Sequence, residues 1–225
     1  MQYRAIETKV LRRISRYAGA AATGTHSRVV DASVNRAGSI ARDIPTHVSR
    51  AELNCLYQLA AGLAGAPTLL EIGSYLGASG RFLAAGMPAA GLLYCVDTWQ
   101  NETMPEGPRE TLPEFRRNIA PFANSITVVQ KNSKDLSAED IRLPLDLVFI
   151  DGDHSYGAVK RDFETVAPWL GDGKVLAFHD CTYFEGVSRV VGEAMAMGGW
   201  QIGGNVDSLV WLRKVANISH RFPNS

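Results

Sequence analysis

Short apolar segments alternate with amphipathic segments along most of the chain. Five apolar runs bounded by glycine, proline or polar turns are typical of buried parallel strands; they lie at residues 68–71, 92–96, 126–130, 145–150 and 174–178. Apolar positions at helical spacing predict helices between and after the runs, at residues 77–85, 110–120, 137–141, 157–170 and 185–197. Two last strands, 200–202 and 208–212, are expected to pair across a Gly203-Gly-Asn turn.

This alternation predicts an α/β fold. We expect a Rossmann-like, doubly wound sheet of seven strands, mostly parallel with an antiparallel terminal hairpin, and helices on both faces. Ahead of the first strand, Ser49-Arg-Ala-Glu52 is a capping-box pattern that begins a helix ending near Gly62–Gly65.

The first 47 residues differ from the rest in charge and pattern. Residues 1–50 carry nine Lys or Arg against three acidic residues. Helical spacing from Tyr3 to Tyr17 predicts a basic amphipathic helix, and residues 18–45 read as a linker or a substrate lid. This helix could pack on the domain or on a second subunit, or bind a membrane surface or an anionic substrate. We therefore divide the chain into a basic helical extension or lid (1–47) and a main domain (48–225).

Composition narrows the class of protein. A chain of 225 residues suits one main domain. Its formal net charge is zero, so no overall positive charge favours binding of nucleic acid. Three scattered cysteines, Cys55, Cys95 and Cys181, lack metal-type spacing and indicate a reducing compartment. No apolar run is long enough for a membrane span, and no signal-peptide core is present. We expect a cytoplasmic protein, and the basic extension makes a homo-oligomer plausible.

Each predicted strand ends in a polar or acidic residue. These are Glu71, Asp97, Ser133, Asp151, and His179 with Asp180. Any one of them alone could be a helix cap. Because the carboxyl ends of parallel strands lie along one edge of a sheet, we expect these groups to converge there.

The glycine loop after the first strand identifies the type of cofactor. A dinucleotide fingerprint has the spacing G-x-G-x-x-G, which lets pyrophosphate meet backbone amides, whereas this loop has Gly73-x-x-x-Gly77. Glu71, just before the turn, would repel phosphate and suits a cation. S-adenosylmethionine carries a sulfonium and an ammonium group and no phosphate, so the loop favours that ligand. Asp97, after the next strand, is placed to accept hydrogen bonds from the ribose hydroxyls.

The segment Leu-Glu71-Ile-Gly-Ser-Tyr-Leu-Gly-Ala-Ser resembles the first motif of class I S-adenosylmethionine-dependent methyltransferases, close to the form in catechol O-methyltransferase. Phe-Ile-Asp151-Gly-Asp-His154-Ser-Tyr resembles a motif of bacterial O-methyltransferases that act on sugars or secondary metabolites. The similarity runs from about Val48 to Arg213. It implies that the methionine part of the cofactor is held by Glu71, Gly73, Ser74, Tyr75 and Gly77, the ribose by Asp97, and the adenine by Trp99 and Ser133.

The same resemblance suggests the reacting groups. In the catechol type, the acid matching Asp151 ligates Mg²⁺ and a lysine three residues later is the general base; here that position is His154. Histidine titrates near neutral pH, as a general base should, although His154 could instead cap a helix. Asp151 and Asp180 could hold a divalent ion. His179 could join them, which would favour Mn²⁺ over Mg²⁺, or act as a second base.

Together these patterns predict transfer of a methyl group from S-adenosylmethionine to a hydroxyl of a small molecule, a sugar or natural product, with possible help from a divalent metal. Alternatives that remain open are a nitrogen acceptor, a cell-surface glycan, a nicotinamide-dependent oxidoreductase and a non-catalytic cofactor-binding subunit.

Overall fold

The computed structural model describes residues 44–102 and 106–215. The expected basic helix of residues 3–17, and nearly all of the extension, lie outside these ranges. The longer helices and the strands, in chain order, are α3 (Arg50–Ala61), β1 (Thr68–Ile72), α4 (Ala78–Gly86), β2 (Leu92–Asp97), α5 (Leu112–Ile119), β3 (Ile126–Gln130), β4 (Leu145–Ile150), α6 (Tyr156–Val166), β5 (Leu170–Phe178), α7 (Glu185–Met197), β6 (Trp200–Val206) and β7 (Leu209–Lys214). Short 3₁₀ turns lie at Ala120–Phe122, Ser133–Asp135 and Ala167–Trp169. No helix within the described ranges is long and apolar enough to cross a membrane.

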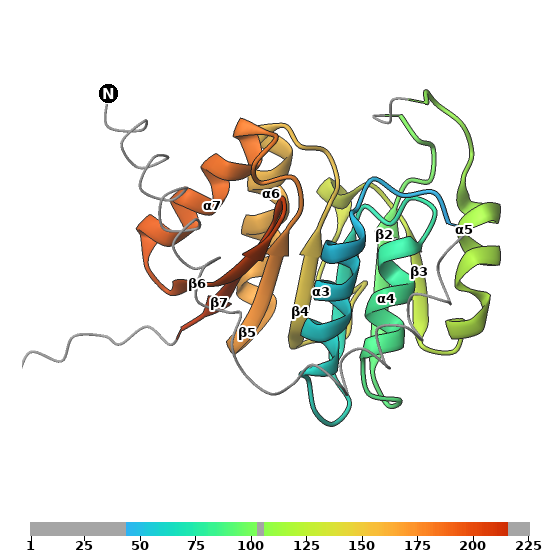
Figure 1. Cartoon of the computed structure of the whole chain (residues 1–225), viewed down its shortest axis with the longest axis horizontal. Coiled ribbons are helices and arrows are strands. Elements are labelled where there is room, and N and C mark those ends of the chain that lie inside the picture. Colours follow the sequence, from blue (N-terminus) through green and yellow to red (C-terminus); the bar gives the residue numbers. More distant parts are fainter. Residues whose placement is uncertain (1–43, 103–105, 216–225) are drawn as a thin grey trace, which may run out of the picture.

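The seven strands form one sheet in the order β3-β2-β1-β4-β5-β7-β6 (Figure 1). Strands β1 to β5 are parallel to one another, and β7 inserts antiparallel between β5 and β6. The predicted fold, mostly parallel with an antiparallel terminal hairpin, is confirmed.

Alternate residues of the central strands face two separate cores, because successive side chains of a strand point to opposite faces. On one face Leu70 and Val148 pack with the apolar residues of α6 and α7. On the other, Leu69 and Leu147 pack with residues of α3, α4 and α5. Helices therefore cover both faces of the sheet. The edge formed by the carboxyl ends of the parallel strands lies between these two helix layers.

Three local predictions were wrong. The helix expected at 137–141 is a turn, in which the Asp140 carboxylate accepts hydrogen bonds from the Ser137 amide (2.9 Å) and hydroxyl (3.0 Å); such side-chain bonds compete with helix formation. Strand β5 begins at Leu170 rather than Lys174. Gly171 and Gly173, which were expected to end the helix predicted at 157–170, therefore lie inside the strand.

The third error concerns the terminal hairpin. Gly203 and Gly204 lie within β6, and the chain turns at Asp207 and Ser208 instead. The indole of Trp211 on β7 lies directly against both glycines, and a Cβ at either would overlap the ring. These glycines serve close packing, which a sequence pattern cannot distinguish from a turn.

Gly204→Ala is therefore expected to lower the free energy of unfolding by about 1–3 kcal/mol, because the added methyl group overpacks a well-filled contact with Trp211. Denaturant unfolding would measure the loss. Gly157→Ala is the matched control: Gly157 is exposed in α6, and its Cβ would meet only Arg161 at 3.7 Å. That change should be neutral or stabilising by up to about 1 kcal/mol; equal effects of the two substitutions would contradict the packing argument.

Candidate active site

The glycine loop follows β1 at the centre of the sheet and is held tightly against β4. Gly73 has φ +86°, and a Cβ there would overlap the backbone carbonyl of Asp151. Gly77, also at φ +86°, precedes α4, and its Cβ would press on the rings and methyls of Phe115 and Ile119 at 3.0 Å. Both positions therefore require glycine, and the spacing reflects the packing of the loop between β4 and α5.

Asp97 fastens this loop to the end of β2. One of its oxygens, Oδ2, accepts hydrogen bonds from the amides of Ser74 (2.9 Å) and Tyr75 (2.8 Å), and Oδ1 accepts one from the amide of Trp99 (2.8 Å). The Trp99 side chain is fully buried, packs on Phe115 at 4.7 Å between ring centroids, and donates its indole N–H to the Tyr75 carbonyl at 3.0 Å. Trp99 thus supports the loop from the core.

Glu71 also lies beneath the loop. Its side chain is fully buried and its Oε2 accepts a hydrogen bond from the Cys95 thiol at 3.4 Å, whereas Oε1 has no partner among the described residues. Burial raises the pKa of Glu71 to about 7 because the charged form is poorly solvated there.

Two adjoining cavities open at the strand ends. The first, of about 630 Å³, lies between residues 45–48, the glycine loop, residues 151–155 and residues 179–184. The second, of about 370 Å³, lies between the ends of β2, β3 and β4. They share Gly73, Tyr75 and residues 151–153, so an elongated ligand can extend from one into the other across the loop. Cavities of this size suit small ligands and cofactors.

The residues predicted to form the site are divided between these cavities and the core. Ser74 and Gly77 line the first cavity, together with Gly73, Tyr75 and the polar ends of β4 and β5. Asp97 and Ser133 line the second. Glu71 and Trp99 line neither, and the structure gives their side chains no direct access to a ligand in either cavity.

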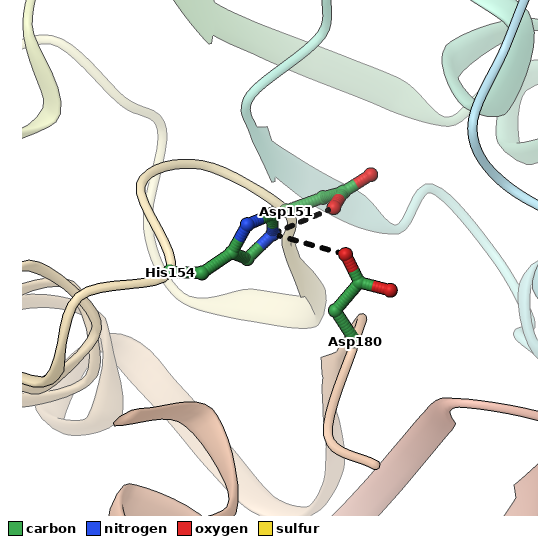
Figure 2. A group of neighbouring side chains, drawn as sticks. All are labelled: Asp151, His154 and Asp180. Atoms are coloured by element: carbon green, nitrogen blue, oxygen red, sulfur yellow. Dashed lines mark ion pairs between the residues drawn. The ribbon is translucent and has the colours of Figure 1, made fainter. Parts of the chain in front are cut away.

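Asp151, His154 and Asp180 converge in the first cavity (Figure 2). The His154 Nε2 lies 3.5 Å from Asp151 Oδ1 and 3.5 Å from Asp180 Oδ2. Burial opposes ionisation of Asp151, but the neighbouring imidazoles of His154 and His179 outweigh it and hold the pKa of Asp151 below its usual value. Asp180 has φ +57°, a conformation uncommon outside glycine that often marks functional sites.

His179 lies behind this cluster and contacts carboxylates through both ring nitrogens. Its Nδ1 is 3.0 Å from Asp151 Oδ1, and its Nε2 is 3.1 Å from Glu52 Oε2. Burial alone would lower the pKa of His179, but Asp151 and Glu52 raise it to about 10. These contacts favour the protonated ring, in which both nitrogens donate to carboxylates and neither carries a lone pair. The cluster of metal-type ligands contains His154 in the place expected of His179, and the role of His179 as a metal ligand or second base stays a prediction.

Glu52 is the residue that sequence reasoning missed. Its side chain bonds within the expected capping box, where Oε2 accepts a hydrogen bond from the Ser49 amide at 2.8 Å. The same carboxylate also crosses to the β6–β7 turn and accepts hydrogen bonds from the Ser208 hydroxyl (2.6 Å) and the Leu209 amide (3.0 Å). Glu52 thereby connects α3, His179 and the terminal hairpin behind the site.

Oxygen and nitrogen ligand atoms of the Asp151–His154–Asp180 cluster all lie within 4.8 Å of one another. Two carboxylates and one imidazole form a plausible donor set for a divalent cation. The positive charge on His179, in contact with Asp151, weakens the attraction of the cluster for a cation. The donor set thus fits a metal in geometry, and the nearby charge opposes it.

The sheet order, the glycine loop and the acids at the strand ends define a class I methyltransferase arrangement. Residues 70–181 match the family model described as a methyltransferase domain. This match agrees with the resemblance to class I S-adenosylmethionine-dependent methyltransferases that the loop motif carries.

Solved structures support the same fold. The O-methyltransferase NovP superposes with a TM-score of 0.67 at 13% identity, over 85% of this chain and 100% of that one. An O-methyltransferase from Bacillus cereus in complex with S-adenosylhomocysteine gives 0.59 at 19% identity, over 93% and 100%. TomG from Streptomyces achromogenes, an O-methyltransferase of tomaymycin synthesis in complex with S-adenosylmethionine, gives 0.58 at 18%, over 91% and 96%.

Proposed function

We propose that this enzyme transfers the methyl group of S-adenosylmethionine to a hydroxyl oxygen of a small molecule, either a sugar or a natural product. The observation that carries the proposal is the placement of His154 between Asp151 and Asp180 in the cavity that the glycine loop also lines. A proton acceptor thus lies in the same cavity as the expected position of the methyl donor.

The residues present fit the cofactor in several respects. The Ser74 hydroxyl is buried at the first cavity and has no hydrogen-bond partner among the described residues, which leaves it free for the amino-acid end of the cofactor. We assign that end to Gly73, Ser74, Tyr75 and Gly77. Asp97 would use its remaining lone pairs for the ribose. Ser133 would contact the adenine, and Thr98, which lines the second cavity, takes the contact first expected of Trp99.

Glu71 would act on the cofactor through charge rather than contact. It lies beneath the loop with one carboxylate oxygen unpartnered. A sulfonium or ammonium group bound above the loop would favour its ionised form and would lower its pKa from about 7. A phosphate in the same position would raise the pKa instead and favour the neutral carboxyl, so the charge of Glu71 contributes to binding only with a cationic ligand.

When bound, the cofactor supplies a methyl carbon activated by the adjacent sulfonium. The protein's part is to align the acceptor and remove its proton. We assign proton removal to His154 Nε2, the nitrogen that points between the two carboxylates. Because both carboxylates approach this same nitrogen at 3.5 Å, Asp151 and Asp180 would stabilise the imidazolium once the proton is on Nε2.

A metal-assisted version is the second candidate. In that version Asp151, His154 and Asp180 would ligate Mn²⁺ or Mg²⁺, and the ion would lower the pKa of the acceptor hydroxyl. The donor set supports this version, whereas the protonated His179 beside Asp151 disfavours it. The two versions give His154 different roles, which a substitution can separate.

Calorimetry with S-adenosylhomocysteine tests the proposed function. We expect saturable binding by the wild-type protein, with NADH as the matched control ligand giving no signal, because Glu71 and the loop spacing disfavour pyrophosphate. Absence of S-adenosylhomocysteine binding at millimolar concentration would refute the cofactor assignment. Binding of NADH alone would support the oxidoreductase alternative.

A further inference from the structure

A buried side chain at the second cavity has no role in the function proposed above. Asn101 lines this cavity together with Asp97 and is only 6% exposed. Its carbonyl oxygen, Oδ1, is buried and has no hydrogen-bond partner among the described residues. Because nearly all buried polar groups in folded proteins are hydrogen-bonded, an unpaired acceptor at the wall of a cavity indicates a donor on the ligand.

The loop that follows β2 fixes the orientation of the Asn101 amide. Its Nδ2 donates a hydrogen bond to the Gly107 carbonyl at 2.7 Å. A carbonyl oxygen can only accept, so the amide must present its nitrogen to Gly107 and direct Oδ1 elsewhere. The loop is closed at its base, where the Thr111 amide donates to the Trp99 carbonyl at 2.9 Å. Oδ1 is therefore held in place as a hydrogen-bond acceptor.

Asp97 alone does not provide acceptors for both hydroxyls of a ribose. A carboxylate offers about four lone-pair sites. Three of the sites on Asp97 are already used, because Oδ2 accepts from the amides of Ser74 and Tyr75 and Oδ1 accepts from the amide of Trp99. The ribose of S-adenosylmethionine presents two neighbouring hydroxyl donors, so one of them requires an acceptor on another residue.

Asn101 is the acceptor best suited to this second hydroxyl. The other carboxylates in the described lining of the second cavity are those of Glu102, Asp151 and Asp153. Glu102 and Asp153 are exposed and therefore hydrated, and Asp151 Oδ1 already contacts two imidazoles. Donating to an exposed carboxylate only replaces a bond to water, whereas a buried unpaired oxygen gains a hydrogen bond when the ligand binds.

We propose that Asn101 Oδ1 accepts a hydrogen bond from one ribose hydroxyl of the cofactor, while Asp97 accepts one from the other. The inference rests on the proposed function and adds a binding residue to its cofactor site. With its nitrogen bonded to Gly107 and its oxygen to the ribose, one side chain would connect the loop after β2 to the cofactor.

Removing the side chain and the hydroxyls in turn tests the proposal. Calorimetry compares S-adenosylhomocysteine with its 2′-deoxy and 3′-deoxy analogues on the wild type and on Asn101→Gly. Glycine is chosen because Asn101 has φ +56°, which alanine would adopt only with strain. We expect Asn101→Gly to weaken binding of S-adenosylhomocysteine about 3- to 10-fold. Binding of the analogue that lacks the hydroxyl bonded by Asn101 should change by less than about twofold.

A purely structural role would give a different pattern. If Asn101 only held the loop through Gly107, the substitution would weaken all three ligands by the same factor, and the proposal would be overturned. S-inosylhomocysteine, which lacks the adenine amino group, extends the comparison to the base. If the penalty of Asn101→Gly disappeared with this ligand and persisted with both deoxy analogues, Oδ1 would bind the adenine instead, which would also overturn the proposal.

The wild-type protein provides a measurement that does not depend on the folding of a variant. Because both hydroxyls are bonded in the proposal, each deoxy analogue should bind about 3- to 10-fold more weakly than S-adenosylhomocysteine. An analogue that binds as tightly as S-adenosylhomocysteine would overturn the proposal. Failure of S-adenosylhomocysteine itself to bind would refute the proposed function, whereas its normal binding with the same penalty for every ligand in Asn101→Gly refutes only the role of Asn101.

Asn205→Ala is the matched control. Asn205 also has a buried Oδ1 without a partner among the described residues, but it lies in β6, at the edge of the sheet opposite β3, and lines neither of the two cavities. Its substitution should leave the affinity for S-adenosylhomocysteine unchanged. An equal loss of affinity in Asn205→Ala and Asn101→Gly would show a general loss of stability and would overturn the assignment of Asn101 to the ribose.

Discussion

Replacing His154 by alanine is expected to reduce kcat by about 10²–10⁴-fold, the usual contribution of a general base. The affinity for S-adenosylhomocysteine should change little, because the residues assigned to the cofactor lie in the glycine loop and at the ends of β2 and β3. The variant should also fold, since His154 is partly exposed and its principal side-chain contacts are the Phe184 ring and two carboxylates at 3.5 Å. Single-turnover methyl transfer and calorimetry measure the two effects separately.

The same variant separates the two versions of the mechanism. If His154 is the base, added imidazole should restore part of the activity of His154→Ala, and EDTA should not affect the wild-type enzyme. If His154 is a metal ligand, EDTA should inactivate the wild type, and a divalent ion should restore it. Full activity in His154→Ala would exclude both roles and would move the base to another residue of the cluster.

Much of the fold followed from sequence pattern because buried parallel strands leave short apolar runs and the sheet forces their ends together. For the same reason the convergence of Asp151, His179 and Asp180 could be predicted from their places after two strands. The predictions failed where a residue type serves two purposes. Gly203 and Gly204, for example, accommodate the indole ring of Trp211 and do not form the turn that was expected of them.

Trp99 illustrates a second limit. The resemblance to class I methyltransferases implied that Trp99 contacts the adenine. In the structure Trp99 has φ +53°, and its side chain is buried against Phe115. Sequence pattern carries no signal for such a backbone conformation in a residue other than glycine. The same limit applies to Asn101, which has φ +56°.

At Glu52, a correct local interpretation of the sequence concealed a contact with a residue far along the chain. The capping box explained the acid completely at the level of sequence, and the box is present. The second carboxylate oxygen, however, is directed toward Ser208, which lies 156 residues further along the chain. Only the pairing of the terminal hairpin with β5 brings that turn to the N-terminus of α3, and a local motif cannot predict such a contact.

Loss of this buried carboxylate should have the largest effect on stability of any substitution considered for this chain. Glu52 is 2% exposed and accepts hydrogen bonds from the amides of Ser49, Ser208 and Leu209 and from the Ser208 hydroxyl, besides its contact with His179. Burial opposes its ionisation, but these donors hold the pKa of Glu52 far below its usual range. Glu52→Ala would leave the Nε2 of His179 and several amides unpaired in the interior, while Nδ1 keeps its contact with Asp151.

We therefore expect Glu52→Ala to lower the free energy of unfolding by about 3–5 kcal/mol, measured by denaturant titration at neutral pH. Glu139→Gln, at an exposed site, is the control and should change it by less than about 0.5 kcal/mol. The difference between wild type and Glu52→Ala should also depend on pH. Because the folded state lowers the pKa of Glu52 below its ordinary 4.5, the stabilisation is present above that pH and is lost as the pH falls through the folded value. If Glu52→Ala lowers the free energy of unfolding by less than about 1 kcal/mol, water replaces the carboxylate. The same conclusion follows if the difference in unfolding free energy between wild type and variant grows as the pH falls. Either result would mean that Glu52 does not hold His179 in place.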